Sequence, residues 1–203
     1  AIDKYHEIYR TLGKLKELPP KAPVPNDIHR RMIDIKGAGY FLDVAHVGIC
    51  AIPKSAWLVE AEVLFHSHAI VIVQAFGRLP EEENLAHAWC AGLEETVAEF
   101  RAFEVAIAIS EHIQYMGFSA TAHDRDTGDV DADRLSVLSG VALREGTSIT
   151  NPYLGEKFAV AVVTTDYELE TDLPLHASAK RAKGLGYWMG VGGAVPGLSL
   201  IHI

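Results

Sequence analysis

The chain has 203 residues, a length that suits one globular domain of ordinary size. Hydrophobic residues make up 49% and charged residues 22%, which is typical of a chain with a core and excludes disorder over its whole length. The formal net charge of -9 would repel phosphate backbones, so we expect no nucleic-acid partner.

The N-terminal part of the chain predicts two helices separated by an extended connector. Apolar residues at helical spacing predict the first helix over residues 2–17. Four prolines in residues 18–27 then favour an extended chain, because proline fixes φ and lacks a backbone donor. Asn26 or Asp27 is expected to cap a second helix that runs to about Lys36. Gly37 and Gly39 leave its end open, and the alternative is that a short helix resumes through Leu42 and Asp43.

Two buried strands and a long helix are expected next. Residues 45–53 form an apolar run closed by a proline, and residues 67–76 are dense in β-branched side chains. Residues 84–116 have apolar positions three or four apart, which predicts one long helix or two helices joined near Gly92. Gly117 should end this helical region.

The last third of the domain continues the alternation of strand and helix. We expect a short strand over residues 118–124, then a helix over residues 132–144 that Asp131 caps. Residues 147–155 are interpreted as a loop, and a buried strand begins near Phe158 and runs into an acidic turn. This order predicts a three-layer α+β domain with a central mixed or antiparallel sheet flanked by helices.

The sequence divides into three segments. Residues 1–25 hold the first helix and the connector, and residues 26–175 hold the α+β domain. Residues 176–203 are a glycine-rich extension, which we expect to be truncated. No apolar run reaches the roughly 18 residues of a membrane span, so we expect no membrane partner and a cytoplasmic location.

Few residue patterns point to chemistry by themselves. His66 and His68 lie on one face of an extended segment and offer two metal ligands, or else are two histidines at the start of a strand. The aspartates of residues 124–133 lack the order of a calcium loop, so we interpret them as a solvated turn. Cys50 and Cys90 are interpreted as buried thiols, and their small number fits a reducing compartment.

Three stretches, taken in order, resemble a known family. They are "AIAISEHIQYMGFSATAH", "DADRLSVLSGVALREGTSITNPYLG" and "KFAVAVVTTDYELETDLPL". Together they resemble the corrinoid-binding region of cobalamin-dependent reductive dehalogenases and, more distantly, that of epoxyqueuosine reductases. The likeness covers roughly residues 28–175.

The resemblance implies a nitroreductase-like fold that holds cobalamin as a cofactor and acts on a small organohalide substrate. In that family, two iron–sulfur clusters bound by runs of cysteines reduce the cobalt. Residues 176–203 contain no cysteine, so the catalytic and iron–sulfur region is expected downstream in a full-length protein. We therefore interpret this chain as a fragment of a reductive dehalogenase that is inactive by itself.

Two alternative functions stay open. The first is a stand-alone corrinoid-binding or trafficking module, and the second is a flavin-dependent enzyme of the nitroreductase type, because that fold serves both cofactors. The sequence also leaves open whether the protein forms a homodimer.

The resemblance also suggests where a cofactor would lie. It implies that the loop with Ser148, Asn151, Tyr153 and Gly155 approaches the corrin, with backbone N–H groups directed at its amide or phosphate groups. The alternative is an ordinary connection between a helix and a strand. Asp166 is expected to cap or orient the turn that follows it. No catalytic residue is assigned, and the conceivable proton donors are Tyr115, Tyr153, Tyr167 and Tyr187.

Overall fold

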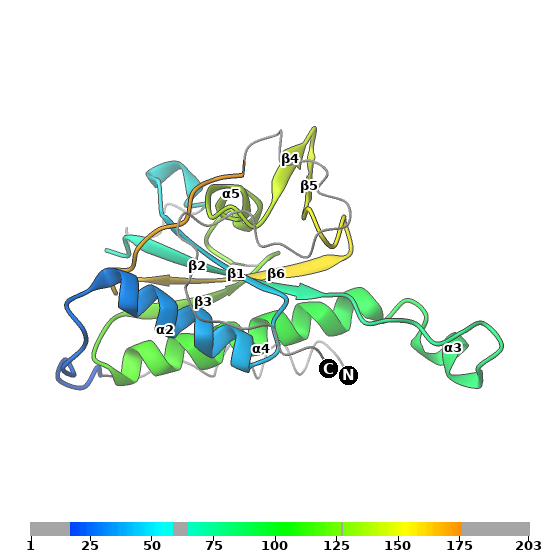
Figure 1. The fold of residues 1–203 in the computed structure, drawn as a ribbon, viewed down its shortest axis with the longest axis horizontal. Coiled ribbons are helices and arrows are strands. Elements are labelled where there is room, and N and C mark those ends of the chain that lie inside the picture. The colour runs from blue at the N-terminus through cyan, green and yellow to red at the C-terminus, as the bar shows by residue number, and fades with distance from the viewer. Residues whose placement is uncertain (1–16, 59–64, 127, 176–203) are drawn as a thin grey trace.

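A four-stranded antiparallel sheet organises the chain (Figure 1). The computed structural model describes residues 17–58, 65–126 and 128–175. The strand order is β1-β2-β6-β3, and every neighbouring pair is antiparallel. The bounds of the strands are His46–Ala51 for β1, His68–Ala75 for β2, Ala120–Asp124 for β3 and Phe158–Thr165 for β6.

Both faces of this sheet are buried, which explains the unbroken apolar runs in the central strands. In β2, Ile70 and Ile72 face one core, whereas Val71 and Val73 face the other. Strand β6 is buried at every position. Because side chains alternate between the two faces of a strand, a strand covered on both sides must be apolar throughout.

Helices α2 (Ile28–Phe41) and α4 (Glu94–Tyr115) cover one face of the sheet, while α5 (Ala132–Leu138) covers the other. A short hairpin of β4 (Leu143–Glu145) and β5 (Ser148–Thr150) lies beside α5. The arrangement confirms the predicted α+β domain with an antiparallel sheet between helical layers. The helix predicted over residues 2–17 lies almost wholly outside the described residues, as does the extension after residue 175.

Helix α2 is longer than predicted. Asp27 caps it as expected, since its carboxylate accepts from the backbone N–H of His29. It continues past Lys36 to Phe41 without a break, with Gly37 and Gly39 inside it, so the helical pattern that the sequence left open after Gly39 belongs to the same helix. A Cβ on Gly39 would come within 2.6 Å of Val47, so this glycine allows α2 to pack closely on β1.

The region predicted over residues 84–116 is two helices. Helix α3 (Leu85–Cys90) and α4 are separated at Gly92, whose φ is 83°. Gly117, with φ of 84°, follows α4 as predicted. Cys50 is buried as predicted, but the prediction of a buried Cys90 was wrong, because this residue is partly exposed on α3.

Helix α5 is shorter than predicted. Asp131 caps it through the backbone N–H of Arg134 at 2.9 Å, but the helix ends at Leu138 rather than near residue 144. Gly140 has φ of 72° and turns the chain into β4. Part of the predicted loop over residues 147–155 is therefore strand β5, with Gly146 at the hairpin turn (φ 64°).

Residues 166–175, which we call the strap, run back over α2 and β1. Asp172 donates its backbone N–H to the carbonyl of Ile49, and its carboxylate accepts from the N–H of Ile49 at 2.8 Å. The same carboxylate binds the Lys36 ammonium at 2.6 Å, and both side chains are nearly buried. A buried carboxylate needs such partners, so Lys36 and Ile49 fix the position of the strap.

Two glycine-to-alanine changes should shift stability in opposite directions. Gly140→Ala should lower the free energy of unfolding by about 1–3 kcal/mol, because its φ is positive and a Cβ would meet the carbonyl of Leu173 in the strap. The matched change Gly37→Ala has no neighbouring atom within 4 Å and should raise this free energy by about 0.5–1 kcal/mol. Urea unfolding measures the free energy of unfolding of both variants. Equal effects would contradict the close contact of Gly140 with the strap.

Candidate functional site

A cluster of polar side chains, His66, Ser119, His123, Thr164 and Asp166, lies at one end of the sheet. His66 precedes β2, Ser119 precedes β3, Thr164 ends β6, and His123 lies within β3. His66, His123 and Thr164 are buried, and Ser119 is half-buried. We call these five residues the polar cluster.

Thr164 is the centre of the polar cluster. Its hydroxyl lies 2.8 Å from Nδ1 of His66 and 2.9 Å from Nε2 of His123. The other ring nitrogen of His66, Nε2, lies 2.7 Å from the hydroxyl of Ser119. A chain of hydrogen bonds thus joins three strands across the sheet.

The hydrogen bonds of the polar cluster can all be formed at once if each group donates in the same direction along the series. The backbone N–H of Asp129 donates to Nδ1 of His123, which leaves Nε2–H of His123 to donate to Thr164. The Thr164 hydroxyl can then donate to Nδ1 of His66, and Nε2–H of His66 donates to Ser119. This direction requires both imidazoles to be neutral, and burial lowers the pKa of His66 although the Asp166 carboxylate opposes the shift.

Asp166 holds Ser119 in place. Its carboxylate accepts from the backbone N–H of Ser119 at 2.7 Å, and its own N–H donates to the Ser119 carbonyl. The sequence suggested instead that Asp166 caps the next turn, but there the Thr165 hydroxyl accepts from the N–H of Tyr167. Asp166 therefore joins the ends of β6 and β3.

The loop expected to approach a corrin uses its polar groups internally. The Asn151 side chain is buried, donates to the carbonyl of Val141 and accepts from the N–H groups of Tyr153 and Leu154. The N–H of Gly155 donates to the Asn151 carbonyl at 2.9 Å. Ser148 is exposed on β5 and lies outside this turn. These backbone donors therefore stabilise the loop itself.

Of the tyrosines suggested as proton donors, the three that the structure describes do not converge. Tyr115 and Tyr153 are exposed, at the end of α4 and in the loop after β5. Tyr167 is buried against Phe118, with ring centroids 4.7 Å apart, and burial raises its pKa. Tyr187 lies outside the described residues.

The metal interpretation of His66 and His68 finds no third ligand among the residues that the structure describes. Both nitrogens of His66 are used in the polar cluster, and Nδ1 of His68 lies 2.8 Å from the Ser67 hydroxyl. In residues 17–58, 65–126 and 128–175, no three His, Cys, Asp or Glu side chains are arranged to hold a metal ion.

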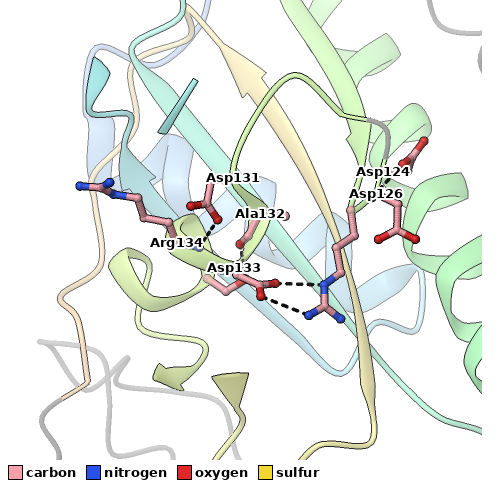
Figure 2. A network of polar contacts seen from close by, with 8 residues as sticks. Asp124, Asp126, Asp131, Ala132, Asp133 and Arg134 are labelled. Atoms are coloured by element: carbon pink, nitrogen blue, oxygen red, sulfur yellow. Dashed lines mark hydrogen bonds and ion pairs between the residues drawn. The ribbon is translucent and has the colours of Figure 1, made fainter. Parts of the chain in front are cut away.

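The acidic segment over residues 124–133 is held by its own contacts. Asp133 accepts two hydrogen bonds from the Arg125 guanidinium, at 3.0 and 3.2 Å. Figure 2 shows the labelled Asp133 with these two contacts as dashed lines. Asp131 caps α5, and Asp124 accepts from the N–H of Asp126. These contacts are those of a turn that leads into a helix cap, as the sequence suggested.

Sequence reasoning missed most of the polar cluster. Thr164 bonds to residues 98 and 41 positions away, and Ser119 lies 53 positions from His66, so no local motif joins them. The available signal was the presence of Thr164 in β6, a strand that is otherwise mainly apolar and buried at every position. Polar groups in a buried strand require partners, but the sequence does not say which.

Removing the Thr164 hydroxyl tests the polar cluster. Thr164→Val keeps the shape of the side chain but leaves nitrogens of two buried imidazoles without this partner. We expect the free energy of unfolding to fall by about 1–3 kcal/mol in urea unfolding. The control Thr121→Val, at the position paired with Thr164 on β3, should change it by less than about 0.5 kcal/mol. Similar losses for both variants would argue against the cluster.

Acid should destabilise the fold through its buried histidines. Burial, aided by the Lys36 ammonium, lowers the pKa of His46 to about 4, so the folded state keeps this imidazole neutral while the unfolded chain protonates near pH 6.5. Stability should therefore be constant above pH 6.5 and fall as the pH drops towards 4. The urea midpoint of His46→Gln should fall less between pH 7.5 and 5. Parallel pH curves for this variant and the parent chain would refute the assignment.

Solved structures of reductive dehalogenases are similar to this chain. No protein-family model matches it, and no curated protein gives a significant match. The catabolic reductive dehalogenase NpRdhA aligns with a TM-score of 0.77 and 30% identity over 86% of this chain and 25% of that chain. Its complex with 3-bromo-4-hydroxybenzoic acid aligns at 31% identity over 24% of that chain.

A second enzyme class shares the fold alone. Epoxyqueuosine reductase in complex with a tRNA stem loop aligns with a TM-score of 0.55 and 11% identity, over 74% of this chain and 49% of that chain. The enzyme from Bacillus subtilis gives a TM-score of 0.54, also at 11% identity. This chain spans about a quarter of the length of the dehalogenases that it matches. Reductive dehalogenases are thus its neighbours in structure and sequence, and epoxyqueuosine reductases are neighbours in fold.

Proposed function

We propose that this chain is a cobalamin-domain-like part of a reductive dehalogenase and that it does not catalyse dehalogenation by itself. The observation that carries the proposal is the alignment with NpRdhA, in which 30% identity and a TM-score of 0.77 extend over 86% of this chain. A related structure is described in terms of B12-dependent dehalogenation, and it aligns equally well. The activity of the whole protein would be reductive removal of halogen from a small organohalide.

Neither the loop with Asn151 nor the described groove between α2 and α4 is suited to holding a corrin. The loop that should approach it donates its N–H groups to its own Asn151. A groove lined entirely by described residues lies between α2 and α4, has a volume of about 210 Å³ and is almost wholly apolar. Ligand pockets span roughly 300–1,000 Å³, and a corrin needs the upper part of that range. We therefore propose that no chemical step takes place on cobalamin in this chain by itself.

The cysteines of this chain also do not suit electron transfer. Each [4Fe–4S] cluster takes four thiolates, and the whole chain has two cysteines. Burial raises the pKa of the Cys50 thiol to about 12, and the Asp172 carboxylate adds to the shift. The reducing cofactors of the proposed enzyme would belong to another part of the polypeptide.

The proposed location is the cytoplasm, which the two free cysteines support. No helix in the described part of the chain is long and apolar enough to cross a bilayer. The proposed partners are an organohalide substrate and the catalytic, iron–sulfur part of the same polypeptide.

A spectroscopic titration with cobalamin, followed by gel filtration, tests the proposal. The 203-residue chain should neither shift the spectrum of micromolar cobalamin nor co-elute with it, and it should release no halide from a halogenated phenol. The full-length protein from the same gene should do all three. Co-elution of corrinoid with the 203-residue chain would instead favour a stand-alone corrinoid binder, and a bound flavin would favour a nitroreductase-type enzyme.

A further inference from the structure

The chain exposes a group of large apolar side chains at one end of the domain. Helix α3 and the first turn of α4, residues 85–97, form what we call the arm, and Figure 1 shows α3 beyond the end of the sheet. The exposed fractions are 97% for Leu85, 76% for Trp89, 38% for Leu93 and 53% for Val97. Leu85 and Trp89 lie one turn apart on the same face of α3, while Leu93 and Val97 follow the break at Gly92 at the start of α4. Large exposed apolar side chains close together in the chain favour a surface that binds another protein surface.

The arm has little support from the domain. Helix α3 is six residues long and contains no buried residue. Its hydrogen bonds to other described residues are local, such as the Asn84 cap on Ala86 and the bond from the His87 ring to the Pro80 carbonyl. A helix of this length is marginal without packing against another element. A covering surface would therefore supply the packing that the domain does not.

The charges around the arm indicate what kind of surface would cover it. Five glutamates adjoin the apolar residues of the arm, against one arginine: they are Glu81, Glu82, Glu83, Glu94 and Glu95, with Arg78. Two copies of the arm packed face to face would bring two such acidic sets together, in a chain that already has a net charge of -9. Like charges at an interface disfavour pairing, whereas a surface with lysine or arginine at its rim would be favoured.

We propose that the arm docks into an apolar groove with a basic rim on the catalytic remainder of the same polypeptide. The inference rests on the proposed function, because the alignment accounts for only 25% of a dehalogenase chain and leaves three quarters of its length without a counterpart here. Trp89 is the central anchor, since large aromatic side chains dominate the energetics of protein interfaces. The glutamates set the orientation of docking at the rim.

Site-specific photo-crosslinking in the full-length protein tests this proposal. Benzoylphenylalanine replaces Trp89 in one variant and Leu85 in another, and mass spectrometry locates the products. We expect crosslinks within one polypeptide, to an apolar segment beyond residue 203 that is flanked by Lys or Arg. The probe placed at Glu17 should not reach that segment, because Glu17 is exposed and lies five residues before Ala22, whose N–H donates to the Met116 carbonyl at the other end of α4.

Charge reversal supplies a matched comparison. Glu82→Lys should lower the crosslink yield from position 89 about twofold or more, and added salt should lower the yield of the parent protein. Glu17→Lys makes the same change at the far end of the domain and should leave the yield unchanged. Equal crosslink yields for Glu82→Lys and Glu17→Lys would show that the surface that binds the arm has no basic rim.

Three results would overturn the docking inference while leaving the proposed function intact. They are crosslinks to a second copy, which double the mass on a denaturing gel, crosslinks to a separate protein, and no crosslink from either position. The proposed function fails on different grounds: the gene encodes no cysteine-rich continuation, or the full-length protein neither binds cobalamin nor releases halide. The two failures are therefore distinguishable.

Discussion

The burial of both faces of the sheet is the constraint on which the rest of this structure depends. Strands β2 and β6 carry apolar side chains on both sides, so each face needs a covering layer to remove it from water. Helices α2 and α4 supply one layer, and α5 with its neighbouring hairpin supplies the other. Close packing of these layers explains glycines such as Gly39 and Gly48, where a Cβ would meet atoms of Val47 and of Ser139 and Val141.

A sheet buried on both sides must also satisfy any polar group that it contains. Thr164 bonds to both His123 and His66, and His66 bonds in turn to half-buried Ser119, where this series of hydrogen bonds ends. At the edge strand β1, Asp172 performs a similar role, because it pairs with Lys36 and binds the backbone of Ile49. The polar cluster and the strap thus join segments that are far apart in the sequence.

Fold and chemistry separate in this chain. The fold aligns with dehalogenases at 30% identity. Asn151 nevertheless donates to the carbonyl of Val141 within the domain. The two cysteines of the chain are too few to bind an iron–sulfur cluster. Among the large apolar side chains that the described residues expose are Leu85 and Trp89 of the arm. Such a surface is suited to packing against another part of a larger assembly.

The sequence by itself determined most of the element order, because apolar periodicity and caps are local. The cap at Asp131 and the buried strand at Phe158–Thr165 could be predicted, whereas the cap at Asp27 and the break at Gly92 were each one of two alternatives that the sequence left open. Only the tertiary structure decided where α5 ends, since Gly140 turns there beneath the strap. It also decided the polar cluster, because Thr164 meets partners 41 and 98 residues away, and such contacts depend on strand order rather than on local spacing.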